Sequence, residues 1–125
     1  MDMGIGIDVV NIDRMKHLSE HACQRMFHPE ELKEAELLSS ERRAEYLAGR
    51  FAAKEAFGKA LGTGLSGLSL QEIRVERQSD GRPVLRLEGK ALQLLGARKA
   101  LVSISHDQPV AVAMVVLGGG ADGPF

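Results

Sequence analysis

The order of apolar and polar positions predicts a strand followed by a helix at the start of the chain. Residues 4–10 form a short apolar run with several β-branched side chains, which is typical of a buried strand. Asn11 follows this run and can cap a helix by accepting a bond from a free backbone N–H. Ile12, Met15 and Leu18 then recur at helical spacing.

The next third of the chain has helical periodicity. Pro29 suits the first turn of a helix over residues 29–38, because its missing N–H costs nothing there. Ser39 or Ser40 can cap the longest predicted helix, which runs to about Leu61. The Gly-Thr-Gly sequence at 62–64 then breaks the helical pattern.

The second half of the chain is richer in predicted strands. Alternation and turn residues predict a hairpin, a short helix and a second hairpin. These are a strand at 70–78, a turn at 79–81, a strand at 84–87, a helix after Gly89, and strands at 101–105 and 110–117 joined by a turn at 106–109. Helices gather in the first half and hairpins in the second, so the predicted fold class is α+β rather than a doubly wound parallel sheet.

Composition adds the broad class of protein. With 125 residues and 44% hydrophobic side chains, the chain can form one domain, which we place at residues 1–117 with a flexible Gly-rich tail at 118–125. The single cysteine, Cys23, cannot form an intramolecular disulfide, and the net charge of -1 does not favour nucleic acid as a partner. The first residues lack signal-peptide character, and the longest apolar run is too short to cross a membrane. We therefore expect a cytoplasmic protein.

A carboxylate interrupts the apolar stripe of the long helix. Ala44, Leu47 and Phe51 share one side of that helix at about 100° per residue, and Glu55 falls on the same side. An ionised carboxylate at a buried position is costly unless a charge or hydrogen bonds compensate it. Periodicity alone favours an ordinary ion pair of Glu55 with Lys59, four residues later.

Asp8 is a second carboxylate inside an apolar segment. By itself it is best read as a strand-end residue that caps the following helix. Together with Glu55 it allows another interpretation, in which one cation compensates both carboxylates. A small set of oxygen ligands suits Mg²⁺, which keeps water and takes substrate phosphates into its shell. No sequence rule places the two carboxylates side by side.

Two further features have both an ordinary and a functional interpretation. His106 ends a β-branched run and would stand at the rim of a sheet, where a histidine is more often a plain turn residue than a catalyst. Gly62 and Gly64 most simply end the helix. Their functional interpretation is close approach of the backbone to a phosphate, although the spacing is not that of a Walker loop.

Three segments in register resemble a known family. They are Gly4-Ile5-Gly6-Ile7-Asp8 with a following Arg14, the stretch Arg50-Phe51-Ala52-Ala53-Lys54-Glu55-Ala56-Phe57 with Lys59 to Gly64, and Ser103-Ile104-Ser105-His106. Together they resemble holo-[acyl-carrier-protein] synthase, the small bacterial type of 4'-phosphopantetheinyl transferase. The resemblance extends from Gly4 to about Leu117.

The resemblance implies an activity, a fold and a set of residues. Such enzymes transfer the phosphopantetheine arm of coenzyme A to a serine of apo acyl carrier protein, release adenosine 3',5'-bisphosphate and serve fatty acid biosynthesis. The implied fold is one long helix packed on an antiparallel sheet, assembled as a homotrimer. By similarity, Asp8 and Glu55 would hold Mg²⁺, and Lys59 and His106 would contact phosphates. The implied catalytic residues are Asp8, Glu55 and Lys59.

The resemblance also implies the binding residues around this centre. Gly62 and Gly64 would let the backbone approach coenzyme A. Arg42, Arg43 and Arg50 correspond to a basic stretch that holds the 3'-phosphate and adenine end, whereas a solvated charged face is an equal alternative for Arg42 and Arg43. An acidic carrier protein would dock on the early helices, through residues that include Arg14 and Arg25.

Two other classes of function remain open at the level of sequence. The first is a non-catalytic module of the same fold that binds coenzyme A or the carrier protein without forming product. The second is a structural trimeric interaction domain that binds no coenzyme A. Retention of Asp8, Glu55, Lys59 and His106 disfavours the first, because loss of function usually leaves a gap among such positions, and failure to bind coenzyme A would favour the second.

Overall fold

The computed structural model describes residues 3–120 and contains helices and strands in a mixed order. The elements are β1 (Gly4–Asn11), α1 (Asp13–Lys16), α2 (Glu20–Met26), α3 (Pro29–Glu36), α4 (Ser40–Leu61), the 3-10 turn η1 (Leu70–Glu72), β2 (Ile73–Arg77), β3 (Pro83–Leu87), α5 (Gly89–Leu95), β4 (Lys99–Asp107) and β5 (Val110–Gly118). This α+β composition confirms the predicted fold class.

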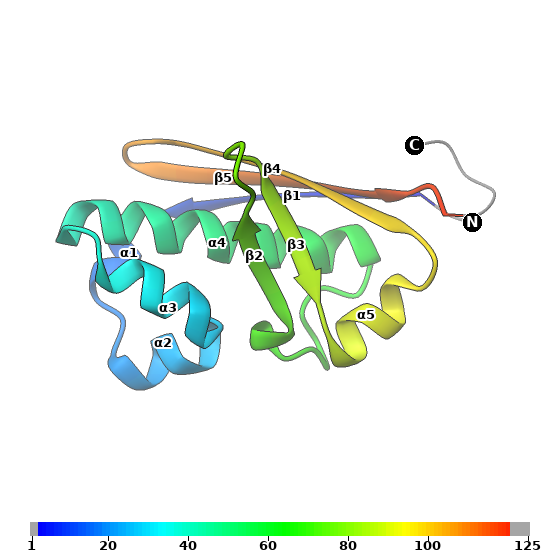
Figure 1. Cartoon of the computed structure of the whole chain (residues 1–125), viewed down its shortest axis with the longest axis horizontal. Helices are drawn as coiled ribbons and strands as arrows, with labels where there is room; N and C mark the ends of the chain where they lie inside the picture. The colour runs from blue at the N-terminus through cyan, green and yellow to red at the C-terminus, as the bar shows by residue number, and fades with distance from the viewer. Residues whose placement is uncertain (1–2, 121–125) are drawn as a thin grey trace.

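The long helix α4 lies along one face of an antiparallel sheet (Figure 1). That sheet has three strands in the order β1-β5-β4, so the first strand pairs with the last. A separate hairpin, β2-β3, crosses beside α4, and the short helices α1, α2 and α3 lie below α4, to the left of the hairpin in Figure 1. The sheet and the helix therefore enclose the core between them.

Helix α4 forms where the sequence predicts it. The Ser39 hydroxyl accepts a bond from the backbone N–H of Arg42 at its start, and Gly62 ends it with a left-handed φ of 85°. Half of its buried positions are alanine, because the helix lies close to the strands and leaves little room for larger side chains. This close approach decides where the side chains of the candidate site lie.

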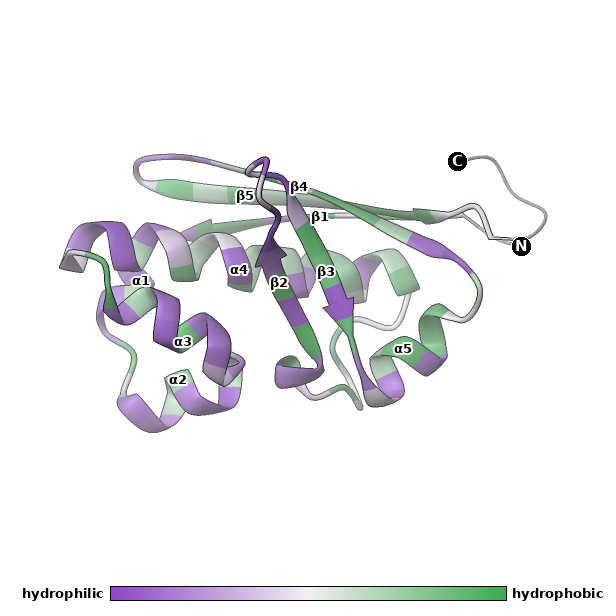
Figure 2. Cartoon of the chain, in the orientation of Figure 1, coloured by the Kyte–Doolittle hydropathy of each residue, from purple (hydrophilic) through white to green (hydrophobic). Residues whose placement is uncertain are grey.

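The two faces of the sheet differ in what covers them. Gly6, Val10 and their neighbours in register face α4 and are buried, whereas Ile5, Ile7 and Val9 alternate onto the other face and are exposed. Figure 2 colours much of these strands as hydrophobic. Strand β1, which the sequence predicts to be buried, is thus buried on the α4 side only.

Several local predictions needed correction. Residues 20–26 form a separate helix, α2, which Ser19 caps by accepting from the Ala22 N–H. The predicted strand at 70–78 begins with the turn η1, and only Ile73–Arg77 pairs as β2. Strand β4 continues to Asp107, so His106 lies in the ladder opposite Ala111 rather than in the turn.

The ends of the described chain bear on two further predictions. Strand β5 continues through Gly118, one residue beyond the predicted domain boundary, and residues 121–125 of the predicted tail lie outside the described residues. Within residues 3–120, no helix is both long enough and apolar enough to cross a membrane.

Candidate functional site

Two glycines of β1 let helix α4 touch the strand backbone. A Cβ atom built on Gly4 would lie 2.1 Å from the carbonyl oxygen of Ala60, and one on Gly6 would lie 2.0 Å from that of Ala56. No side chain fits at such distances, so only glycine permits this approach. The consequence is that Asp8, which follows on the same face of β1, lies against α4.

Asp8 and Lys59 meet at this contact between strand and helix. The Lys59 ammonium donates to Asp8 Oδ1 at 2.9 Å and to the carbonyl oxygen of Ile7 at 3.0 Å. Asp8 is largely covered, and half of the Lys59 side chain is exposed. The ion pair that periodicity favoured, Lys59 with Glu55, is therefore replaced in the structure by a pair between distant segments.

Glu55 shares the electrostatic environment of Asp8. Burial and the negative charge of Asp8 raise the pKa of Glu55, while the positive charges of Lys59 and Arg14 lower it. Two carboxylates whose negative charges repel each other at a half-buried position favour a cation between them. The structure therefore brings together the residues that the sequence could only pair by analogy.

This pair of carboxylates fits a hard divalent cation that is not fully enclosed by protein. In the part of the chain that the structure describes, no cluster of three or more His, Cys, Asp or Glu side chains could hold a metal ion by itself. Asp8 and Glu55 offer only oxygen ligands and too few of them to complete a shell. Mg²⁺ binds in this way, through one or two carboxylates with water and phosphate oxygens.

The loop after α4 returns to the helix beside this centre. The N–H of Gly64 donates to the carbonyl oxygen of Gly58 at 2.9 Å, and a Cβ on Gly58 would lie only 2.6 Å from the Gly64 carbonyl carbon. Gly62 and Gly64 have left-handed φ values of 85° and 65°, with open space where a side chain would be. An exposed backbone thus lies one turn beyond Lys59.

A fully buried ion pair supports α4 from the opposite side, and sequence reasoning missed it. Lys54 is 0% exposed and donates to Glu31 Oε1 at 2.6 Å, and also to the carbonyl oxygens of Met26 and Leu70. Glu31 in turn accepts the N–H groups of His28 and Val75. The pair ties α4 to α2, α3, η1 and β2, directly before Glu55 in sequence.

We expect the variant Lys54→Met to lose about 3 kcal/mol of stability, because it leaves the Glu31 carboxylate buried without a countercharge. The double variant Lys54→Met/Glu31→Gln should be more stable than the single one, since no buried charge then lacks a partner, and the one amide oxygen of glutamine can still accept one of the two backbone N–H groups that bind separate oxygens of Glu31. Urea unfolding followed by circular dichroism measures both. A double variant no more stable than Lys54→Met would show that the buried charge is not the cause.

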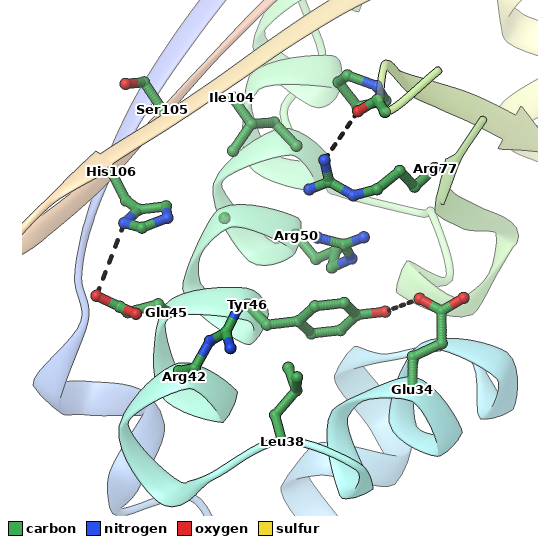
Figure 3. A pocket seen from close by; sticks show the side chains of 13 residues that line it. Glu34, Leu38, Arg42, Glu45, Tyr46, Arg50, Arg77, Ile104, Ser105 and His106 are labelled. Carbon is green, nitrogen blue, oxygen red and sulfur yellow. Dashed lines mark hydrogen bonds and ion pairs between the residues drawn. The ribbon is translucent and has the colours of Figure 1, made fainter. Parts of the chain in front are cut away.

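A separate groove lies along the first half of α4 (Figure 3). It has a volume of about 780 Å³ and is bounded by α3, α4, the β2-β3 hairpin and the end of β4. Its charged lining residues are Glu34, Arg42, Glu45, Arg50 and Arg77, and His106 also lines it. The groove therefore combines an excess of cations with two carboxylates.

Three of the predicted nucleotide-binding residues line this groove, and Arg43 lines a different hollow. Arg42, Arg50 and His106 line the groove, and His106 Nδ1 lies 3.7 Å from Glu45 Oε2. Arg43 does not line it, because its guanidinium reaches the Cys23 sulfur at 3.9 Å and lines a different hollow. The structure therefore places Arg42 and Arg50 together and Arg43 apart from them.

The two arginines predicted to meet a carrier protein lie on the early helices. Arg14 in α1 lies 5.9 Å from the centre of the Phe51 ring, near enough to Glu55 to lower its pKa. Arg25 in α2 is exposed and lines a hollow between α2 and η1. Arg14 thus connects this surface to the Asp8–Glu55–Lys59 centre.

Sequence reasoning also missed the uncharged and hairpin parts of the groove. Tyr46 lies one turn before Arg50 on α4, and this spacing of four residues was the available signal. Arg77 and Pro83 enter from the β2-β3 hairpin, and no local pattern links them to α4. Among the described residues, the groove and the Asp8 centre share none.

The fold and the site together define a class of transferase. The family model for the 4'-phosphopantetheinyl transferase superfamily matches residues 4–113, so the chain belongs to that family and is a phosphopantetheinyl transferase. The chain is 45% identical over 124 residues to the holo-[acyl-carrier-protein] synthase of Treponema denticola. The aligned residues cover 95% of this chain and 100% of that protein.

Solved structures of such synthases have the same fold. The enzyme of Bacillus anthracis in complex with CoA (3',5'-ADP) matches with a TM-score of 0.81 and 36% identity, over 93% of this chain and 97% of that one. The enzyme of Neisseria meningitidis matches with a TM-score of 0.82 and 34% identity, over 93% and 98%. These similarities confirm the family resemblance that the sequence motifs indicated.

Proposed function

We propose that this enzyme transfers the 4'-phosphopantetheine arm of coenzyme A to a serine of apo acyl carrier protein, releases adenosine 3',5'-bisphosphate and thereby serves fatty acid biosynthesis in the cytoplasm. The observation that carries the proposal is the meeting of Asp8, Glu55 and Lys59 where β1 touches α4. Similarity over nearly the whole length of synthases, including one solved with CoA, supports the substrate.

Asp8 and Glu55 would hold Mg²⁺ in this reaction. When bound, that ion supplies charge neutralisation on the pyrophosphate and holds the reacting groups in line. The Lys59 side chain is half exposed and can place its ammonium against a phosphate oxygen as negative charge develops. Because coenzyme A carries an activated anhydride, positioning and charge neutralisation suffice for most of the acceleration.

The remaining groups position the substrates. The exposed backbone at Gly62 and Gly64 can approach the pantetheine phosphate, and Arg42, Arg50 and His106 can hold the nucleotide end in the groove. The serine nucleophile comes from the carrier protein. Its proton has two candidate acceptors, the Glu55 carboxylate and a water molecule.

We propose that the working enzyme is a homotrimer with its site at the junction of two subunits. The sheet face away from α4 exposes Ile5, Ile7 and Val9 at 68%, 54% and 58%, next to Leu101 and Met114. An apolar face of this kind, on three strands in register, is typical of a protein interface. The separation of the groove from the Asp8 centre within one chain supports a site completed by a neighbour.

The direct test of the activity is a transfer assay. Incubation with coenzyme A, Mg²⁺ and apo acyl carrier protein should raise the mass of the carrier protein by one phosphopantetheine arm. Repeating the assay with several carrier proteins, and with either Mg²⁺ or Mn²⁺, tests phosphopantetheinyl transfer as a reaction rather than the choice of one carrier protein. Coenzyme A binding without any product would instead indicate a non-catalytic module.

The carrier-protein surface makes its own prediction. Arg25→Glu should raise the KM for carrier protein about tenfold and reduce its salt dependence, because an exposed cation steers an acidic partner. Arg14→Glu should do the same, but Arg14 also affects Glu55, so only Arg25 separates docking from chemistry. Lys90→Glu on α5 is the matched control with the same charge change. Steady-state kinetics at several salt concentrations checks this, and an unchanged KM in Arg25→Glu would remove Arg25 from the docking surface.

A further inference from the structure

Arg50 is an unusual cation in the nucleotide groove because it is almost fully buried. The Arg50 residue is only 3% exposed, and burial lowers the pKa of its guanidinium. Within residues 3–120, Arg50 Nε is buried and has no hydrogen-bond partner. A desolvated guanidinium with a free donor is costly, and an anionic ligand offsets that cost.

The aromatic ring of Tyr46 packs against this guanidinium (Figure 3). Arg50 Cζ lies 3.6 Å from the centre of the Tyr46 ring, which is close stacking. The Tyr46 hydroxyl donates to Glu34 Oε2 at 2.5 Å and so ties the ring to α3. Burial and this hydrogen bond raise the pKa of Tyr46, so the hydroxyl stays a donor at neutral pH.

Stacking determines where the donors of Arg50 can point. The N–H groups of a guanidinium lie in its own plane, so a guanidinium stacked on a ring directs them sideways and not into the ring. Arg50 and Arg77 both line the groove, and Arg77 is held there by a bond of 2.8 Å from its Nη1 to the Gly81 carbonyl oxygen. The charge of Arg77 also lowers the pKa of Arg50, whereas the charges of Glu31 and Glu34 raise it. The two carboxylates of α3 therefore compensate part of the repulsion between the arginines, and an anion in the groove would compensate more.

We propose that Tyr46 is the positioning residue that holds Arg50 for the ribose phosphate of the substrate, and that it thereby sets the preference for a 3'-phosphorylated nucleotide. The inference rests on the proposed function, because that function makes coenzyme A the occupant of the groove. Tyr46 positions Arg50, and Arg50 makes the contact with the phosphate. The aromatic ring provides the positioning, and the bond to Glu34 keeps the ring in place.

Binding of two nucleotides, with no transfer step, tests the proposal. Adenosine 3',5'-bisphosphate and adenosine 5'-monophosphate are titrated by calorimetry into the wild type, Tyr46→Leu and Tyr46→Phe. The wild type should prefer the bisphosphate, and Tyr46→Leu should lose about tenfold of that preference, because it removes a desolvated cation–π contact. Tyr46→Phe should keep the preference within about threefold, since it loses one hydrogen bond only. In transfer assays, Tyr46→Leu should raise the KM for coenzyme A and leave kcat within about twofold.

Controls separate this role from stability and from the proposed function. Phe57→Leu removes a buried ring elsewhere on α4 and should lower the melting temperature without changing the nucleotide preference. An unchanged preference in Tyr46→Leu, equal losses in the leucine and phenylalanine variants, or a wild type without preference would each overturn the inference. Absence of arm transfer together with the expected preferences would contradict the proposed function and leave the role of Tyr46 intact.

Discussion

Replacing Glu55 with glutamine should lower turnover at least about tenfold, and more if the ion is lost altogether. The amide has nearly the same size as the carboxylate but lacks the charge that, with Asp8, favours a divalent cation. Burial and the nearby negative charge of Asp8 raise the pKa of Glu55, so removing one of the two carboxylate charges should weaken metal binding. Titration of activity against Mg²⁺ should show a higher metal requirement in Glu55→Gln.

The matched control for this variant is Glu36→Gln, the same change at an exposed position near the end of α3. It should leave both turnover and the metal requirement unchanged. A Glu55→Gln enzyme with wild-type turnover at low Mg²⁺ would show that Glu55 is not a ligand. A variant that fails to fold is recognised by its circular dichroism spectrum and is set apart from this outcome.

Two inactive variants should restore activity when they are assembled together. Glu55→Gln disables the carboxylate centre, and the double variant Arg42→Ala/His106→Ala disables the nucleotide groove. If each site combines the centre of one subunit with the groove of the next, random assembly at equal amounts leaves about a quarter of the sites with both halves intact. Co-refolding the two proteins should therefore recover about a quarter of the wild-type activity per site.

The alternative geometry predicts a different result. If the centre and the groove of the same chain form one site, every mixed assembly contains only damaged sites, and activity stays at the sum of the two variants. Light scattering on the wild type gives the mass of the assembly, for which we expect three chains. Ile7→Lys, which places a charge on the exposed apolar face, should dissociate the assembly and abolish recovery.

The elements of the fold were largely predictable because their signals are local. The long helix has a serine cap, a regular apolar stripe and a terminal glycine, and these features set its bounds at Ser40 and Leu61. Alternation at residues 70–78, apolar runs and turn residues likewise marked β2, β3, β4 and β5 within a few residues. The prediction failed where two signals were close together, as at α2, where a short amphipathic helix follows α1 after only a brief break.

The candidate site was predictable in its residues but not in its geometry. Asp8 and Glu55 stand out as carboxylates in apolar segments, yet their meeting depends on Gly4 and Gly6 admitting α4 to the strand backbone. That requirement is a tertiary contact, which periodicity does not encode. For the same reason the ordinary pair of Glu55 with Lys59 looked favourable, whereas the structure pairs Lys59 with Asp8.

Buried charges and the groove escaped prediction for related reasons. Lys54 directly precedes Glu55 in the sequence, but its ion-pair partner Glu31 lies on another helix, so no local pattern links the two. Arg77 lines the groove from the β2-β3 hairpin. Because β2 and β3 form a separate two-stranded sheet, no strand pairing predicts that the hairpin lies beside α4. His106 was expected in a turn because Asp107, Gln108 and Pro109 are turn residues, but the ladder with β5 continues past it.

The most direct measurement is a crystal structure with coenzyme A and Mn²⁺ in place of Mg²⁺, in which anomalous scattering locates the ion. We expect a single peak within about 2.2 Å of one oxygen each of Asp8 and Glu55, with the remaining ligands drawn from water and the pyrophosphate. A peak held by only one of these carboxylates, or an ion bound to the nucleotide away from both, would contradict it.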